Sequence, residues 1–133
     1  MEAKLGKAGK QAFRIANLLD DAADALRKRS KRAYREGRIS LEEYMEARAK
    51  ELELRAEVSV VVASDLSGVL EETSHAGENI EKAIREAKGQ IESVRSVRKR
   101  LRIVAALVEL AASLASGNVK SVLRARNTVA QLI

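Results

Sequence analysis

The sequence contains no proline, cysteine or tryptophan, and its only aromatic residues are Phe13, Tyr34 and Tyr44. Proline is the strongest breaker of helices, so its absence favours long uninterrupted helices. The absence of cysteine excludes disulfide bonds and thiolate metal sites. The longest nearly apolar run, residues 103–116, is shorter than the roughly 20 residues that a membrane-spanning helix needs.

The composition suits one folded domain of 133 residues, with 46% hydrophobic and 33% charged residues. Ala, Leu, Arg, Lys and Glu dominate, and these residues are good helix formers. Residues 1–10 are polar and contain glycine, unlike the apolar core of a signal peptide. We therefore expect a soluble, cytoplasmic protein.

Three glycines divide the helical pattern. Gly37, Gly77 and Gly117 lie 40 residues apart, and glycine commonly follows the end of a helix. Short connections between long helices favour antiparallel neighbours. The sequence therefore predicts an all-α fold for residues 1–133, a single elongated antiparallel bundle of three long helices plus a short C-terminal helix. The predicted helices span about 3–36, 40–74, 79–116 and 119–133.

The first predicted turn carries the clearest local signal. Gly37 ends a helix, Ser40 is an N-cap, and Glu43 completes a capping box three residues later. Residues 34–54 resemble the short helical hairpin of bacterial SHOCT-type oligomerisation segments, which share a Gly-x-Ile-Ser/Thr-x-Glu-Glu-aromatic core. The resemblance covers about a sixth of the chain, and we carry no function over from it. At the third turn, Asn118 is the expected N-cap of the last helix.

Apolar residues recur at three- and four-residue spacing, which is typical of helices that pack side by side. In the first helix this series includes Ile15, Leu19 and Leu26. In the second helix the stripe is Leu41, Met45, Ala49, Leu52, Ala56, Val60, Ala63, Leu66 and Leu70. We expect each stripe to face the core of the bundle.

The last two predicted helices carry more apolar surface than one packing seam needs. Residues 103–115 are apolar on more than one face, and residues 119–133 add a further apolar series. A helix that is apolar all round must be buried somewhere. We therefore predict self-association through these helices, at Leu107, Leu110, Leu114, Val122, Val129 and Ile133.

The net charge of +6 is distributed in blocks. Residues 1–38 hold 11 Lys and Arg against 5 Asp and Glu, and residues 81–133 hold 11 against 4. Residues 39–80 hold 3 against 10. Pairing of the acidic middle helix with basic neighbours is the simplest interpretation, and Asp20, Asp21 and Asp24 would pair with a neighbouring Lys or Arg in the same way.

Two basic clusters exceed what this pairing needs. The N-terminal cluster is Arg27, Lys28, Arg29, Lys31, Arg32, Arg35 and Arg38, and the central cluster is Arg95, Arg98, Lys99, Arg100 and Arg102. Clustered Lys and Arg attract phosphate, which makes nucleic acid or another polyanion a candidate partner. Only Tyr34 is interleaved with them, which argues against stacking on single-stranded bases. In the predicted bundle the central cluster lies in mid-helix, so the two clusters need not form one patch.

The sequence contains few groups of residues that could carry out catalysis or bind a metal or a phosphate. The single histidine, His75, lies near Ser74 and Glu78 in one predicted loop, whereas a working triad assembles around an oxyanion hole. The carboxylates of residues 42–57 lack the Glu-x-x-His pairs of a di-metal bundle, and no phosphate-binding glycine loop is present. We therefore expect no enzyme activity, no cofactor, no metal and no small-molecule substrate.

These observations favour a non-enzymatic helical protein–protein interaction or scaffold module that forms a homo-oligomer. The alternative is a helical nucleic-acid-binding protein that uses its basic clusters. The sequence does not separate a scaffold from a protein that sequesters one specific partner. Binding to a membrane surface is disfavoured by the absence of tryptophan and the single phenylalanine.

Overall fold

A computed structural model of the chain describes the backbone of residues 7–133 and the side chains of 10–73 and 79–133. It contains six α-helices and no β-strand within residues 7–133, which confirms the all-α bundle. The helices are α1 (Lys7–Arg35), α2 (Leu41–Ala63), α3 (Ser67–Glu72), α4 (Ser74–Ser93), α5 (Val97–Ser116) and α6 (Val119–Leu132). No helix in the described part of the chain is both long enough and apolar enough to cross a membrane.

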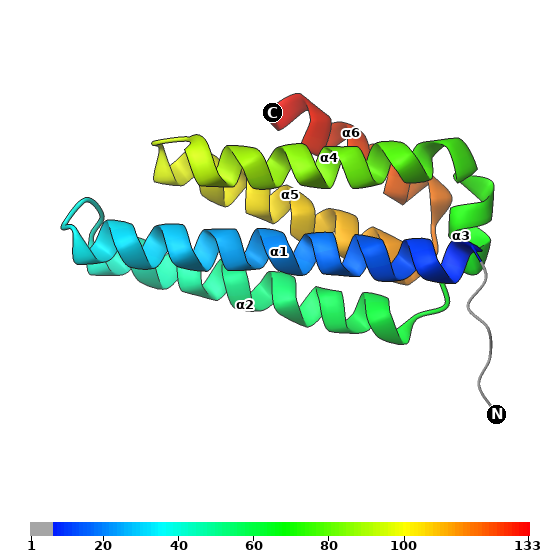
Figure 1. Cartoon of the computed structure of the whole chain (residues 1–133), viewed down its shortest axis with the longest axis horizontal. Helices are drawn as coiled ribbons and strands as arrows, with labels where there is room; N and C mark the ends of the chain where they lie inside the picture. The colour runs from blue at the N-terminus through cyan, green and yellow to red at the C-terminus, as the bar shows by residue number, and fades with distance from the viewer. Residues whose placement is uncertain (1–6) are drawn as a thin grey trace.

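The four long helices lie side by side in an elongated bundle (Figure 1). α1 packs between α2 and α4, α5 packs against α2, and α6 folds back over α5 and α4. Helices that follow each other through a short turn, such as α1 and α2, are antiparallel, as predicted. α1 runs parallel to α4, and α2 runs parallel to α5, because α3 carries the chain across one end of the bundle.

The core runs along the inside of the bundle. Leu19 and Leu26 from α1, Ile84 and Ile91 from α4, and Leu107 from α5 are fully buried. This confirms the predicted core face of the first helix, at Ile15, Leu19 and Leu26. Burying a side chain of this size stabilises the fold by about 1.5–3 kcal/mol, so the shared core holds the helices together.

The predicted helix 40–74 is divided in the structure. α2 ends at Ala63, and residues 64–66 form a turn before α3. The Asp65 carboxylate accepts hydrogen bonds from the Ser67 amide at 3.0 Å and from the Ser67 hydroxyl at 2.6 Å, and these contacts stabilise a local turn. The turn predicted around Gly77 is instead part of α4, since a helix tolerates an interior glycine at a cost of about 1 kcal/mol.

The predicted helix 79–116 is also divided, at residues 94–96, which we call the corner. The Ser96 hydroxyl accepts a hydrogen bond from the Lys99 amide at 3.2 Å and so caps α5. Arg29 of α1 donates to the carbonyl of Glu92 and, at 3.1 Å, to that of Val94, which satisfies the carboxyl end of α4. The bundle therefore has four long helices where the glycine spacing predicts three.

The predicted caps are confirmed. The Ser40 hydroxyl accepts from the Glu43 amide at 3.0 Å, and the Glu43 carboxylate accepts from the Ser40 amide at 2.9 Å. Asn118 caps α6 by accepting from the Ser121 amide at 3.0 Å. Gly117 ends α5 with a φ of 74°, a left-handed conformation that favours glycine.

Candidate functional site

The second helix has apolar stripes on two different faces. Its buried residues are Ala47, Glu51, Leu54, Val58 and Val61, and they also follow three- and four-residue spacing. The predicted core stripe lies on the other face over the whole of α2. We call its α2 members the outer stripe, and they are Leu41, Met45, Ala49, Leu52, Ala56, Val60 and Ala63.

The outer stripe is exposed to solvent, which contradicts its predicted place in the core. Met45 is 62% exposed, Leu41 55% and Leu52 50%. The series that contains Leu54 faces α1 and α5 instead, and the charged Glu51 within it conceals this series from a search for apolar residues. Both stripes satisfy helical spacing, so periodicity alone does not identify the buried one.

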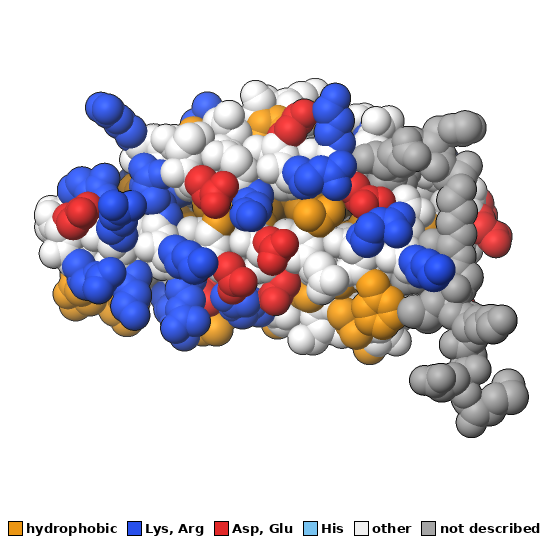
Figure 2. Space-filling model, in the orientation of Figure 1, with side chains coloured by type: hydrophobic (Ala, Val, Ile, Leu, Met, Phe, Trp, Pro, Cys, Tyr) orange, Lys and Arg blue, Asp and Glu red, His pale blue; other side chains and the backbone are white. Residues whose placement is uncertain are grey.

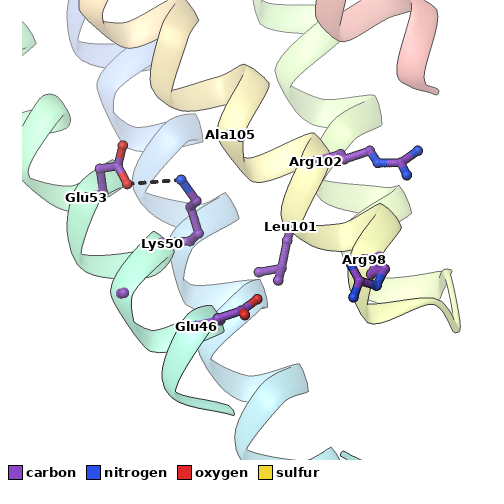
Figure 3. Close-up of a pocket in the computed structure, with 8 residues that line it drawn as sticks. Glu46, Lys50, Glu53, Arg98, Leu101, Arg102 and Ala105 are labelled. Atoms are coloured by element: carbon purple, nitrogen blue, oxygen red, sulfur yellow. Dashed lines mark hydrogen bonds and ion pairs between the residues drawn. The ribbon is translucent and has the colours of Figure 1, made fainter. Parts of the chain in front are cut away.

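A groove of about 420 Å³ lies beside the outer stripe, between α2 and α5 (Figure 3). Ala49, Leu101 and Ala105 give it apolar lining. The charged residues that line the groove give the α2 side a net negative charge and the α5 side a net positive charge. The charged lining residues are Glu46, Lys50 and Glu53 on α2 and Arg98 and Arg102 on α5. The ammonium of Lys50 is paired with Glu53 at 3.2 Å, so the α2 side remains net acidic.

Glu51 is buried on the inner face because two arginines neutralise it. Its carboxylate lies 2.7 Å from the Arg48 guanidinium and 2.8 Å from that of Arg55. Arg55 also reaches Asp20 at 3.0 Å and Asp24 at 2.6 Å on α1, which confirms the predicted pairing of these two aspartates. Burial lowers the pKa of Arg55, but hydrogen bonds to Asp24 and Glu51 outweigh it and raise the pKa overall. This network links α1 to α2 and has a structural role.

The structure brings the two basic clusters to the same end of the bundle. α1 ends there, α4 turns into α5 there, and Arg29 bonds directly to the carbonyl groups of residues 92 and 94. Figure 2 shows Lys and Arg side chains gathered over this end, at the left of the view. The predicted mid-helix position of the central cluster is corrected, because the break at the corner makes residues 97–102 the start of a helix.

Most cluster members at this basic end are exposed. Arg29, Arg32 and Arg38 line a groove of about 390 Å³ together with Glu36 and Glu92. Arg38 is paired with Glu36 at 2.5 Å. The exposed members are Arg27, Lys28, Lys31, Arg32, Arg35, Arg38, Arg95, Arg98, Lys99 and Arg102.

Arg100 differs from every other member of the clusters, because it is only 2% exposed. One guanidinium nitrogen, Nη2, donates to the Arg95 carbonyl at 3.3 Å. Nε and Nη1 are buried without a hydrogen-bond partner, and among the described side chains the only other such atom is the Ser30 hydroxyl. Burial lowers the pKa of Arg100, and the nearby charges of Arg29 and Arg38 lower it further. The signal that could have placed it inward is spacing, because Arg100 lies four residues before Val104 and seven before Leu107 on the buried face of α5.

The residues predicted for self-association lie mainly in the core of the single chain. Five are fully buried and Ile133 is half-buried. α6 covers α5 within the same molecule, and this contact accounts for the extra apolar surface. The buried residues are Leu107, Leu110, Leu114, Val122 and Val129.

The remaining candidates give no assembled site in the described chain. The side chains of Ser74, His75 and Glu78 lie outside the described part. Among the described residues, no three His, Cys, Asp or Glu side chains are grouped to hold a metal ion. Glu109 is exposed and lines a small groove with Arg124 between α5 and α6.

Comparisons with protein-family models, with curated proteins and with solved structures found no match for this chain. Two features of the surface stand out: the outer stripe with its groove, and the basic end.

Proposed function

We propose that the protein is a non-enzymatic helical interaction module that pairs with a second copy of itself through the outer stripe of α2. The observation that carries this proposal is the exposure of an apolar series with regular helical spacing along the whole helix. Scattered exposed apolar residues are ordinary, whereas a continuous apolar face on one helix marks an interaction surface.

The spacing of the stripe indicates that its partner is a helix. Residues at three- and four-residue intervals form one row along a helix, and a second helix packs against such a row over its length. The row extends over the 23 residues of α2, roughly 35 Å. Ala49, Ala56 and Ala63 alternate with larger residues such as Met45 and Leu52, and small residues let a partner helix approach closely.

Charge complementarity favours a second copy as the partner. Helices α2 and α5 run parallel to each other along one side of the bundle. A two-fold axis in the same direction as these helices would set α2 of each copy against α5 of the other. Glu46 and Glu53 would then face Arg98 and Arg102 of the second copy, while Leu101 would meet the outer stripe. Facing charges of opposite sign fix the register of such an interface more than they add affinity.

The proposal is tested by absolute mass from light scattering on a sizing column. We expect a dimer for the wild type and a monomer of unchanged helicity for Met45→Glu/Leu52→Glu, because both side chains are exposed in the single chain. Phe13→Glu is the matched control, since Phe13 is a 48% exposed apolar side chain of α1 and not a member of the outer stripe, and its dimer should persist. A monomeric wild type, or a double variant that stays dimeric, refutes the proposal.

A charge swap tests the arrangement of the two copies. Reversing Glu46 and Glu53 to arginine should weaken the dimer, and so should reversing Arg98 and Arg102 to glutamate. Combining the four reversals should restore the dimer, because each charge again faces its opposite. If the combined variant dissociates as readily as either pair of reversals, α2 does not face α5 of the second copy.

A further inference from the structure

The basic end contains a buried positive charge without a counter-charge. Arg100 is 2% exposed, and two of its guanidinium nitrogens, Nε and Nη1, have no hydrogen-bond partner. A buried cation is ordinarily paired with a carboxylate or coordinated by several acceptors, because desolvation otherwise disfavours the charged form. No carboxylate lies within ion-pair distance of Arg100 in the described chain, in contrast to the four ion pairs that Glu51 and Arg55 form.

Two further arginines lie near this group, and the acidic residues at this end, Glu36 and Glu92, line the neighbouring groove. Arg29 and Arg38 lie close enough for their charges to disfavour the charged form of Arg100. Arg29 donates to the Val94 carbonyl and Arg100 donates to the next carbonyl along the chain, that of Arg95, so the two guanidinium groups flank the corner. The backbone carbonyls satisfy only part of this cationic cluster.

We propose that the corner is an anion-binding site at which Arg100 and Arg29 hold a phosphate group. Guanidinium is the cation best suited to this task, since its planar fork donates two parallel hydrogen bonds to a phosphate. The start of α5 adds to the site through the positive end of its helix dipole, while the Ser96 hydroxyl already accepts from the Lys99 amide there. This inference rests on Arg100 and Arg29 and not on the outer stripe that the pairing through α2 uses, and only Arg98 and Arg102 border both surfaces.

Exposed cations extend the site over the surface around it. Arg32 and Arg38 lie on the α1 side of the corner, Arg95 lies in the corner itself, and Arg98 and Arg102 lie on the α5 side. Such a spread suits repeated phosphates, as in a nucleic-acid backbone, while the buried Arg100 suits a single group. The phosphate is the shared chemistry, and the experiment separates a free phosphoanion from a backbone phosphate.

Thermal unfolding with inorganic phosphate tests the corner directly, with chloride at equal ionic strength as the reference. For the wild type we expect a saturable rise in Tm of several degrees, because a ligand that binds only the folded chain stabilises it. For Arg100→Met we expect this rise to disappear. Arg85→Met, an exposed arginine on α4 outside the two basic clusters, should keep a rise within about twofold of the wild type.

Two further readouts separate binding from a structural role. Without phosphate, Arg100→Met should melt at or above the wild-type Tm, because it removes a buried charge that has no counter-charge. Arg100→Lys keeps the charge and loses the fork, so its apparent affinity for phosphate should fall about tenfold or more. If Arg100→Met melts lower than the wild type and the phosphate effect is the same in both chains, Arg100 is structural and the proposal fails.

A DNA duplex of about 20 base pairs, titrated by fluorescence anisotropy, distinguishes the sources of the phosphate. Binding that weakens about tenfold in Arg100→Met assigns the corner to a backbone phosphate. Phosphate-dependent stabilisation without duplex binding assigns it to a free phosphoanion. A wild-type chain that responds to neither inorganic phosphate nor the duplex overturns the proposal.

Discussion

Removing Arg55 should destabilise the fold far more than removing an exposed arginine. The Arg55 guanidinium contacts three carboxylates, those of Glu51, Asp20 and Asp24, at 2.6–3.0 Å, and its side chain is 27% exposed. Methionine at this position keeps the length of the aliphatic stem and removes only the charge and the hydrogen bonds. Arg55→Met therefore isolates the contribution of the ion-pair network between α1 and α2.

The expected loss follows from the burial of each partner. Breaking a buried pair costs about 3–5 kcal/mol, but Arg48 still neutralises Glu51, so this contact should account for less. Asp20 and Asp24 are about half exposed, and each adds at most about 1 kcal/mol. We expect a total loss of about 2–3 kcal/mol in the free energy of unfolding, or roughly 10 °C in Tm.

Urea unfolding followed by circular dichroism at fixed protein concentration measures this loss, since association would otherwise contribute to stability. The matched control is Arg85→Met, because Arg85 is exposed and its contact with Glu81 is long, at 4.0 Å. This control should stay within about 0.5 kcal/mol of the wild type. An Arg55→Met chain as stable as the control would refute the assignment of this network as a structural link.

Three further outcomes follow from the caps, the glycines and the core. Ser40→Ala should lower the free energy of unfolding by about 1 kcal/mol, measured in urea, because it removes the hydroxyl of the capping box. Gly117→Ala should lower the free energy of unfolding by about 1–2 kcal/mol, because Gly117 has a positive φ. Gly89→Ala lies inside α4 with nothing within 4 Å of the added Cβ, and it should raise the free energy of unfolding by about 0.5–1 kcal/mol. Calorimetry that gives both changes the same sign would contradict this. Leu110→Glu should abolish the cooperative unfolding transition, because Leu110 is fully buried in the single chain; a folded monomer would show instead that its burial belongs to an interface between chains.

Local signals in the sequence predicted the helix ends that depend on neighbouring residues. The Ser40 and Glu43 pair and the Asn118 cap form within a few residues of chain, so their residue types suffice to identify them. The break at Ser96 also has a local cap, but the apolar periodicity continues through it and concealed it. At Gly77 the sequence predicts a turn where the structure continues a helix, since a glycine permits a turn without requiring one.

The candidate sites depended on contacts between distant parts of the chain. Two apolar stripes on α2 satisfied the same spacing, and the stripe containing Glu51 became the inner one because Arg48 and Arg55 neutralise that carboxylate. The surplus apolar surface of α5 predicts an interface between molecules, whereas α6 covers this surface within one chain.

The sequence by itself determined that this chain is helical, where several helices are capped, and that its charge lies in blocks. The tertiary structure decided which apolar faces are buried and which cations share one end of the bundle. The physical reason is that capping and helical spacing act over a few residues. Burial depends instead on which side chains another helix packs against the residue. Arg29 illustrates this, because from α1 it satisfies the end of α4, 63 residues away, at the corner that brings the two basic clusters together.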